Sequence, residues 1–153
     1  MTQPTPAPAT DPAATDLPAN DPAAVEGGFD AVLGLAFDVL TGDEVRARWT
    51  VTTALLQPFG IVHGGVHCTV VETLGSVGGA IWFGERGKVV GVNNSTDFYR
   101  AVTEGEITST ATPVHQGRSQ QVWVVESRDA DGRLVSRGQL RLQNLPHRTA
   151  SAG

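Results

Sequence analysis

The chain has 153 residues, of which 40% are hydrophobic and 18% are charged, and it contains a single cysteine. This length suits one domain with a substantial core. The 11 Lys and Arg residues against 16 Asp and Glu residues give a net charge of −5, which argues against a broad surface for nucleic acid or anionic membranes. One cysteine excludes a disulfide within the chain and a cysteine-rich zinc module, so we expect the reducing environment of the cytoplasm.

Residues 1–25 differ in composition from the rest of the chain. They hold six of the nine prolines and no lysine, arginine or aromatic residue. Such a segment cannot bury enough apolar surface to offset the entropy of ordering it, so we predict a disordered tail. It lacks the basic start and apolar centre of a signal peptide. The folded domain is expected over residues 26–146, with a short flexible end over residues 147–153.

Alternating apolar and polar residues predict several strands. The alternation runs over residues 35–39 and 45–51, on either side of the turn sequence Thr41-Gly42-Asp43, and indicates a β-hairpin with one buried face. The second half shows strand signals in four further segments, which are residues 89–99, 106–115, 119–127 and 134–142. Sequential strands of this kind pair antiparallel. Together with one helix between the two groups, they predict an α+β domain.

That helix is predicted from the low-charge run between Val66 and Phe83, whose only formally charged side chain is Glu72. Eighteen such residues meet the length criterion for a membrane helix. A carboxylate at mid-span is expensive in lipid, so we predict instead a helix inside a soluble protein, with no membrane partner. Gly75, Gly78 and Gly79 are expected to permit another backbone to approach closely, despite a helix cost of about 1 kcal/mol each.

Candidate chemistry concentrates where this helix begins, at His63-Gly64-Gly65. Free N–H groups and the positive end of the helix dipole favour an oxygen that carries negative charge. Glu72 lies about two turns further on, and Ser76 shares its face at i+4. A carboxylate in an apolar helix is costly unless bonded, paired or protonated, so Glu72 is either a functional group or a structural one with a partner. His63 either contacts substrate or caps the helix.

The segment from His63 to Ala80, with its His-Gly-Gly start, acidic residue and small residues, resembles the signature of hotdog-fold acyl-CoA thioesterases. The similarity is greatest to the branch of the phenylacetate-degradation and Arthrobacter-type 4-hydroxybenzoyl-CoA thioesterases. It continues through residues 97–102, 115–118 and 131–134 and covers about residues 34–142. The resemblance implies a hotdog fold, in which an antiparallel sheet of about five or six strands wraps around one long central helix.

The resemblance also implies a role for each candidate residue. Glu72 would be the catalytic carboxylate, and the N–H of Gly64 would polarise the thioester carbonyl. Gln57 would hold the carbonyl or the attacking water, and Ser76 would orient that water or the carboxylate. Water would convert acyl-S-CoA into a carboxylic acid and CoA, with Glu72 as a nucleophile that forms an anhydride or as a general base. Many relatives carry Asp and Asn at positions 72 and 57, and the Glu and Gln here favour aromatic acyl-CoA substrates.

The CoA phosphates need cations, and residues 86–148 carry nine basic side chains against six acidic ones. Arg100, Arg118 and Ser119 lie on segments that resemble the family's CoA-contacting strands, and Gly65 is a further predicted substrate contact. The same arginines would also fit as ordinary solvated strand residues. The resemblance further implies a homodimer, extended to a dimer of dimers, with sheets joined edge to edge, helices side by side and active sites at the interface.

Two histidines at the helix start, His63 and His67, have the i, i+4 spacing of zinc ligands. The glutamate of a His-Glu-x-x-His motif is absent and no further ligand set is evident, so we expect neither a metal nor a cofactor. Cys68 is expected to be a buried, inert thiol. For the function, a non-catalytic acyl-CoA sensor on the same fold is the alternative to a thioesterase. A hotdog dehydratase is disfavoured because the His and Asp pattern of that branch is absent.

Overall fold

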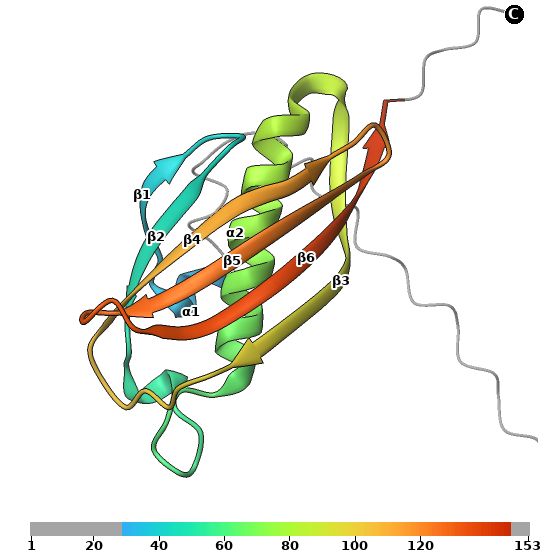
Figure 1. The fold of residues 1–153 in the computed structure, drawn as a ribbon. Coiled ribbons are helices and arrows are strands. Elements are labelled where there is room, and N and C mark those ends of the chain that lie inside the picture. The colour runs from blue at the N-terminus through green and yellow to red at the C-terminus, as the bar shows by residue number, and fades with distance from the viewer. Residues whose placement is uncertain (1–28, 148–153) are drawn as a thin grey trace, which may run out of the picture.

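The structure, a computed structural model, describes residues 29–147, so the predicted tail over residues 1–25 lies outside it, as does all of the predicted C-terminal end except His147. One long helix, α2 (Gly64–Phe83), packs along one face of a six-stranded sheet (Figure 1). The strands are β1 (Ala36–Leu40), β2 (Val45–Thr50), β3 (Gly87–Phe98), β4 (Glu106–Gln116), β5 (Gln120–Asp129) and β6 (Leu134–Pro146). Three short turns of helix complete the fold: α1 (Asp30–Leu33), η2 (Thr53–Leu55) and η3 (Gly84–Arg86).

The strand order in the sheet is β1-β2-β4-β5-β6-β3, and every neighbouring pair is antiparallel. β3 directly follows α2 and η3 in the sequence, yet it pairs with the last strand, β6, and forms one edge of the sheet (Figure 1). A long helix held by a six-stranded antiparallel sheet is the hotdog fold, so the predicted fold class is confirmed. Among the described residues, no helix is long and apolar enough to cross a membrane.

The alternation predicted from the sequence is visible in the burial of the strands. In β2, Val45, Ala47 and Trp49 are buried against the helix. The helix begins at Gly64, two residues earlier than predicted, and ends at Phe83 as expected. β6 extends four residues beyond the predicted limit. The apolar alternation misses this end because the buried residue there is the polar Asn144, whose Oδ1 accepts a hydrogen bond from Gln121 Nε2 at 2.8 Å.

The three helix glycines face the sheet of their own chain. A Cβ atom on Gly75 would lie 2.6 Å from Leu140 Cδ2, and one on Gly78 would lie 2.6 Å from the Trp123 ring. Gly79 likewise lies against the Leu142 side chain. The glycines therefore admit bulky side chains of β5 and β6, and the expectation that they accept another backbone is wrong.

This packing predicts that Gly78→Ala destabilises the protein. Trp123 is fully buried and its Nε1 donates to Gln121 Oε1 at 2.9 Å, so the ring cannot turn away without losing that bond. We expect the overpacking to lower the free energy of unfolding by about 1–3 kcal/mol, which outweighs the gain of about 1 kcal/mol in helix propensity. Urea unfolding measures the difference, and a net stabilisation would show that the ring moves freely.

Candidate active site

The loop before α2 is held tightly against its surroundings. The N–H of Gln57 donates to the carbonyl of Ile61 at 2.8 Å, which closes the loop on itself. The N–H of Val62 donates to the carbonyl of Val102, also at 2.8 Å, which ties the loop to the segment between β3 and β4. The backbone bonds fix the position of the Gln57 side chain relative to the first turn of α2.

The first turn of α2 leaves one backbone donor free. His63 is the N-cap residue, and its Nδ1 accepts a hydrogen bond from the N–H of Gly65 at 2.8 Å. The N–H of Val66 donates to the carbonyl of His63 at 2.9 Å. Within residues 29–147 the N–H of Gly64 has no hydrogen-bond partner. The ring of His63 therefore caps the helix and occupies the amide of Gly65, whereas the amide of Gly64 is available to a ligand.

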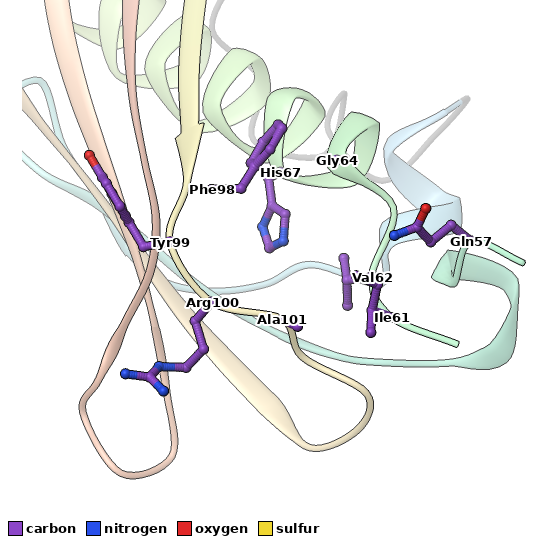
Figure 2. A pocket seen from close by; sticks show the side chains of 9 residues that line it. All are labelled: Gln57, Ile61, Val62, Gly64, His67, Phe98, Tyr99, Arg100 and Ala101. Atoms are coloured by element: carbon purple, nitrogen blue, oxygen red, sulfur yellow. The ribbon is translucent and has the colours of Figure 1, made fainter. Parts of the chain in front are cut away.

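A pocket of about 270 Å³ opens beside this free donor (Figure 2). Its lining residues are Gln57, Ile61, Val62, Gly64, His67, Phe98, Tyr99, Arg100 and Ala101. The ring of His67 extends from α2 into the space between Phe98 and Val62 (Figure 2). The side-chain amide of Gln57 has no hydrogen bond to any other described residue. The pocket thus combines apolar walls with a free backbone N–H and a free amide.

His67 also lines the pocket, whereas its spacing from His63 suggested only a metal ligand. Its side chain is 3% exposed, its Nδ1 lies 3.2 Å from Ser136 Oγ, and its ring packs against Trp49 and Phe98 at 5.9 and 5.6 Å between centroids. Burial lowers the pKa of His67 to about 4, so the imidazole is neutral near pH 7. In the sequence, the position of His67 three residues after Gly64, on the same face of the helix, indicates that it could lie beside the Gly64 amide.

The buried imidazole predicts a loss of stability in mild acid. The pKa of histidine is near 6.5 in the unfolded chain and about 4 for His67 in the folded chain. The unfolded state therefore binds more protons between these values, and the folded state loses stability as the pH falls through this window. We expect this histidine to contribute a loss of about 2 kcal/mol between pH ~7 and pH ~5. Urea unfolding of the wild type and His67→Gln at both pH values measures it, and equal losses in both proteins would contradict the assignment.

Glu72 does not lie in this pocket. It is half-buried in the middle of α2, where its Oε2 accepts a hydrogen bond from Asn94 Nδ2 at 3.3 Å. Eight residues separate it from Gly64, which corresponds to about 12 Å along a helix. Catalytic groups must approach the same reacting carbonyl to about 3 Å, so Glu72 and the Gly64 amide of one chain cannot serve one thioester. Ser76, one turn further on, is also absent from the lining.

The predicted CoA-contacting residues also fall into two groups. Arg100 lies at the pocket, near the start of α2 (Figure 2). Arg118 and Ser119 lie in the turn between β4 and β5, beside the far end of α2 (Figure 1). Two contacts fix that turn near the end of the helix: Gln116 donates to the carbonyl of Gly42, which in turn packs against Trp82. One chain therefore does not bring the predicted cations together.

Metal ligation finds no support in the part of the chain that the structure describes. No group of three or more His, Cys, Asp or Glu side chains there is arranged to hold a metal ion. Cys68 is half-buried rather than fully buried as predicted, and its carbonyl accepts a hydrogen bond from Asn94 Nδ2 at 2.9 Å.

Comparisons with known proteins agree with this architecture. The family model described as the thioesterase superfamily matches residues 59–136, which include the end of the loop, α2, the strands β3 to β5 and the start of β6. The crystal structure of S. sahachiroi AziG shares 55% sequence identity and a TM-score of 0.77, and the match covers 78% of this chain and 98% of that one. The Mycobacterium tuberculosis protein Rv1847 shares 48% identity and a TM-score of 0.77, over 79% and 98% of the two chains.

These matches, together with the fold, identify the chain as a hotdog-fold protein. It belongs to the thioesterase superfamily. A further relative is the 1,4-dihydroxy-2-naphthoyl-CoA hydrolase of Escherichia coli (strain K12). It is 33% identical over 115 residues, which are 75% of this chain and 85% of that protein.

Proposed function

We propose that this protein is an acyl-CoA thioesterase, which hydrolyses a thioester to a carboxylic acid and free CoA. The observation that carries the proposal is the unpartnered N–H of Gly64 at the start of α2, which lines a pocket beside the free side-chain amide of Gln57. A fixed N–H in this position stabilises the negative charge that develops on a carbonyl oxygen during acyl transfer. The superfamily and the relative named as a CoA hydrolase support this reaction class.

In the proposed reaction the thioester carbonyl oxygen accepts a hydrogen bond from the N–H of Gly64. The side-chain amide of Gln57 holds the carbonyl or the attacking water. The carboxylate of Glu72 either takes a proton from that water or attacks the carbonyl carbon itself. The first route gives a tetrahedral intermediate that expels CoA thiolate, and the second gives an acyl anhydride that water then cleaves. Ser76, at i+4 from Glu72, orients the water or the carboxylate.

The separation of Glu72 from Gly64 supports a homodimeric site. In a two-fold dimer the α2 helices of the two protomers could lie side by side and antiparallel, with the axis passing at the height of Cys68. Because Cys68 lies midway between Gly64 and Glu72, the partner's Glu72 would then lie opposite Gly64. Asn94 of β3 contacts Cys68 at that level, so the free edges of two β3 strands would meet about Asn94. Such pairing would use an otherwise unpaired strand edge. A dimer of two such dimers is the larger assembly proposed.

Exposed apolar side chains on β3 support the same interface. Val90, Val92 and Phe98 are 43%, 47% and 52% exposed, although the strand is otherwise rich in polar residues. The antiparallel arrangement would also bring the far end of the partner's sheet toward the pocket end of this chain. Arg100 could then share the CoA phosphates with the partner's Arg118 and the partner's Ser119.

Aromatic acyl-CoA molecules are the proposed substrates. The pocket wall contains the ring of Phe98 and the aliphatic side chains of Ile61 and Val62, which suit a flat apolar acyl group. The combination of Glu72 with Gln57 and the resemblance to the 4-hydroxybenzoyl-CoA and phenylacetate branch also favour aromatic substrates. CoA thioesters and the single cysteine both fit the cytoplasm as the place of action.

The proposal is tested by measuring CoA release with Ellman's reagent. The substrates are phenylacetyl-CoA, hydroxybenzoyl-CoA and a series of short- and long-chain acyl-CoAs. We expect the highest kcat/KM for an aromatic thioester. Equal or higher values for aliphatic chains would contradict the substrate class, and binding of acyl-CoA without turnover of any thioester would favour the non-catalytic sensor.

A further inference from the structure

The carboxylate of Glu72 extends against β3 at a point where this strand is irregular. A Cβ atom placed on Gly91 would overlap Glu72 Oε1, so only glycine leaves room for the carboxylate in its present position. The register of β3 against β6 shifts between Gly91 and Asn93, which makes Val92 an extra residue in the strand. Bulges of this kind redirect neighbouring side chains and are common next to active sites.

Asn94, just after this bulge, bonds the same carboxylate. Its Nδ2 donates to Glu72 Oε2 at 3.3 Å and to the carbonyl of Cys68 at 2.9 Å. Its Oδ1 accepts a hydrogen bond from Thr96 Oγ1 at 2.7 Å. The Thr96 hydroxyl donates to Oδ1 and the Cys68 carbonyl accepts from Nδ2, so these two bonds fix the orientation of the Asn94 side-chain amide, with Nδ2 toward Glu72. The donor is thus pointed at the carboxylate by contacts on both β3 and α2.

No other polar group in residues 29–147 restrains this carboxylate. Glu72 forms no ion pair there, and the hydrogen bond from Asn94 is the only one that its carboxylate accepts. A glutamate side chain has several rotatable bonds, and without a restraint its carboxylate samples many positions. Misplacement of a reacting group by about 1 Å can reduce a rate a hundredfold, so a restraint on Glu72 has a direct effect on turnover.

We infer that Gly91 and Asn94 are positioning residues for catalysis by Glu72. Gly91 provides the space that the carboxylate occupies, and Asn94 holds Oε2 so that Oε1 stays free to take a proton or to attack the carbonyl. The inference rests on the proposed thioesterase function, because it assigns to β3 the task of aiming the catalytic carboxylate. Neither residue contacts the substrate pocket.

The first test is Gly91→Ala. Gly91 is exposed and does not have a positive φ, so alanine fits its backbone. The added methyl group meets only the flexible end of Glu72 at short range, so the fold is expected to persist while the carboxylate moves. We expect kcat to fall about ten- to a hundredfold, with KM and Tm nearly unchanged. Ser95→Ala, at an exposed position of the same strand, is the matched control and should keep wild-type kcat.

The second test separates Asn94 acting through Glu72 from Asn94 acting as a structural link to α2. Asn94→Ala should lower kcat about tenfold at unchanged KM. Asn94→Asp should lower it further, because it places a second carboxylate beside Glu72. In a Glu72→Asp background the shorter carboxylate is out of reach of the amide, so Asn94→Ala should change kcat less than about twofold.

Three results would overturn the inference. An equal loss from Asn94→Ala in both backgrounds would show that Asn94 acts through the helix and not through the carboxylate. Wild-type kcat in both Gly91→Ala and Asn94→Ala, while Glu72→Ala abolishes turnover, would reject positioning and leave the proposed function intact. Wild-type turnover in Glu72→Ala would reject the proposed catalytic role itself, and the inference with it.

Discussion

Replacing Glu72 by alanine is expected to lower kcat by about 10³-fold or more, since loss of a catalytic base or nucleophile typically costs 10²–10⁴-fold or more. KM should change only a few-fold, because Glu72 lies outside the pocket of its own chain and would meet the thioester only at the reacting carbon. Stability should not fall, because the substitution removes a half-buried carboxylate from an otherwise uncharged helix. CoA release at saturating substrate, together with calorimetric binding of the same thioester, measures both effects.

Two further variants sharpen this prediction. Glu72→Gln keeps the size of the side chain but has neither a base nor a nucleophile, so it should lose turnover as Glu72→Ala does. Glu85→Ala removes an exposed glutamate just beyond the end of α2 and should behave as wild type. An unaltered rate in Glu72→Ala would show that Glu72 is not a catalytic residue. Loss of acyl-CoA binding in parallel with turnover would instead identify Glu72 as a binding residue.

Local patterns in the sequence predicted the elements of the fold. Alternation identified β2 because the buried residues Val45, Ala47 and Trp49 follow the pleat directly. The place of β3 at the edge of the sheet was not predictable from local pattern. It depends on pairing with β6, which is formed about forty residues later in the chain. The helix glycines were misinterpreted for a related reason, since a small residue indicates close approach without indicating whether a backbone or a side chain approaches.

The candidate site was predictable only in part. Gly64 and Gln57 were identified and do lie together at the pocket. His67 was missed because a histidine in an apolar run is equally compatible with the core, and only the fold shows that its ring faces the pocket. The distance between Gly64 and Glu72 follows from helix geometry alone. The sequence therefore predicts both this separation and, through the family resemblance, active sites at a dimer interface, but a resemblance does not state which protomer supplies each residue.

The other large effect is expected from Gly64→Pro, which removes the free N–H without removing any side chain. Gly64 is the first residue of α2, where proline is well tolerated because its missing N–H is not needed by the helix. His63 has ψ 135°, which suits a residue before proline. Loss of one oxyanion donor should reduce kcat about 10²–10³-fold.

Gly64→Ala is the matched control for the added atoms. Its Cβ would lie 2.8 Å from the ring of Phe98, as that of proline would, but the N–H is kept. Phe98 is half exposed and its ring can turn, so Gly64→Ala should lose less than about tenfold in kcat. An equal loss in both variants would assign the effect to the displaced ring and not to the donor.

Mixing the two inactive variants, Glu72→Ala and Gly64→Pro, then tests whether the site is shared between protomers. After co-expression, half of the dimers should contain one chain of each kind, and each mixed dimer should hold one complete site, formed by Gly64 of the first chain and Glu72 of the second. About a quarter of the wild-type activity per site should return, as expected for random assembly of a two-fold dimer. If both groups act within one chain, every site lacks one of them and no activity returns.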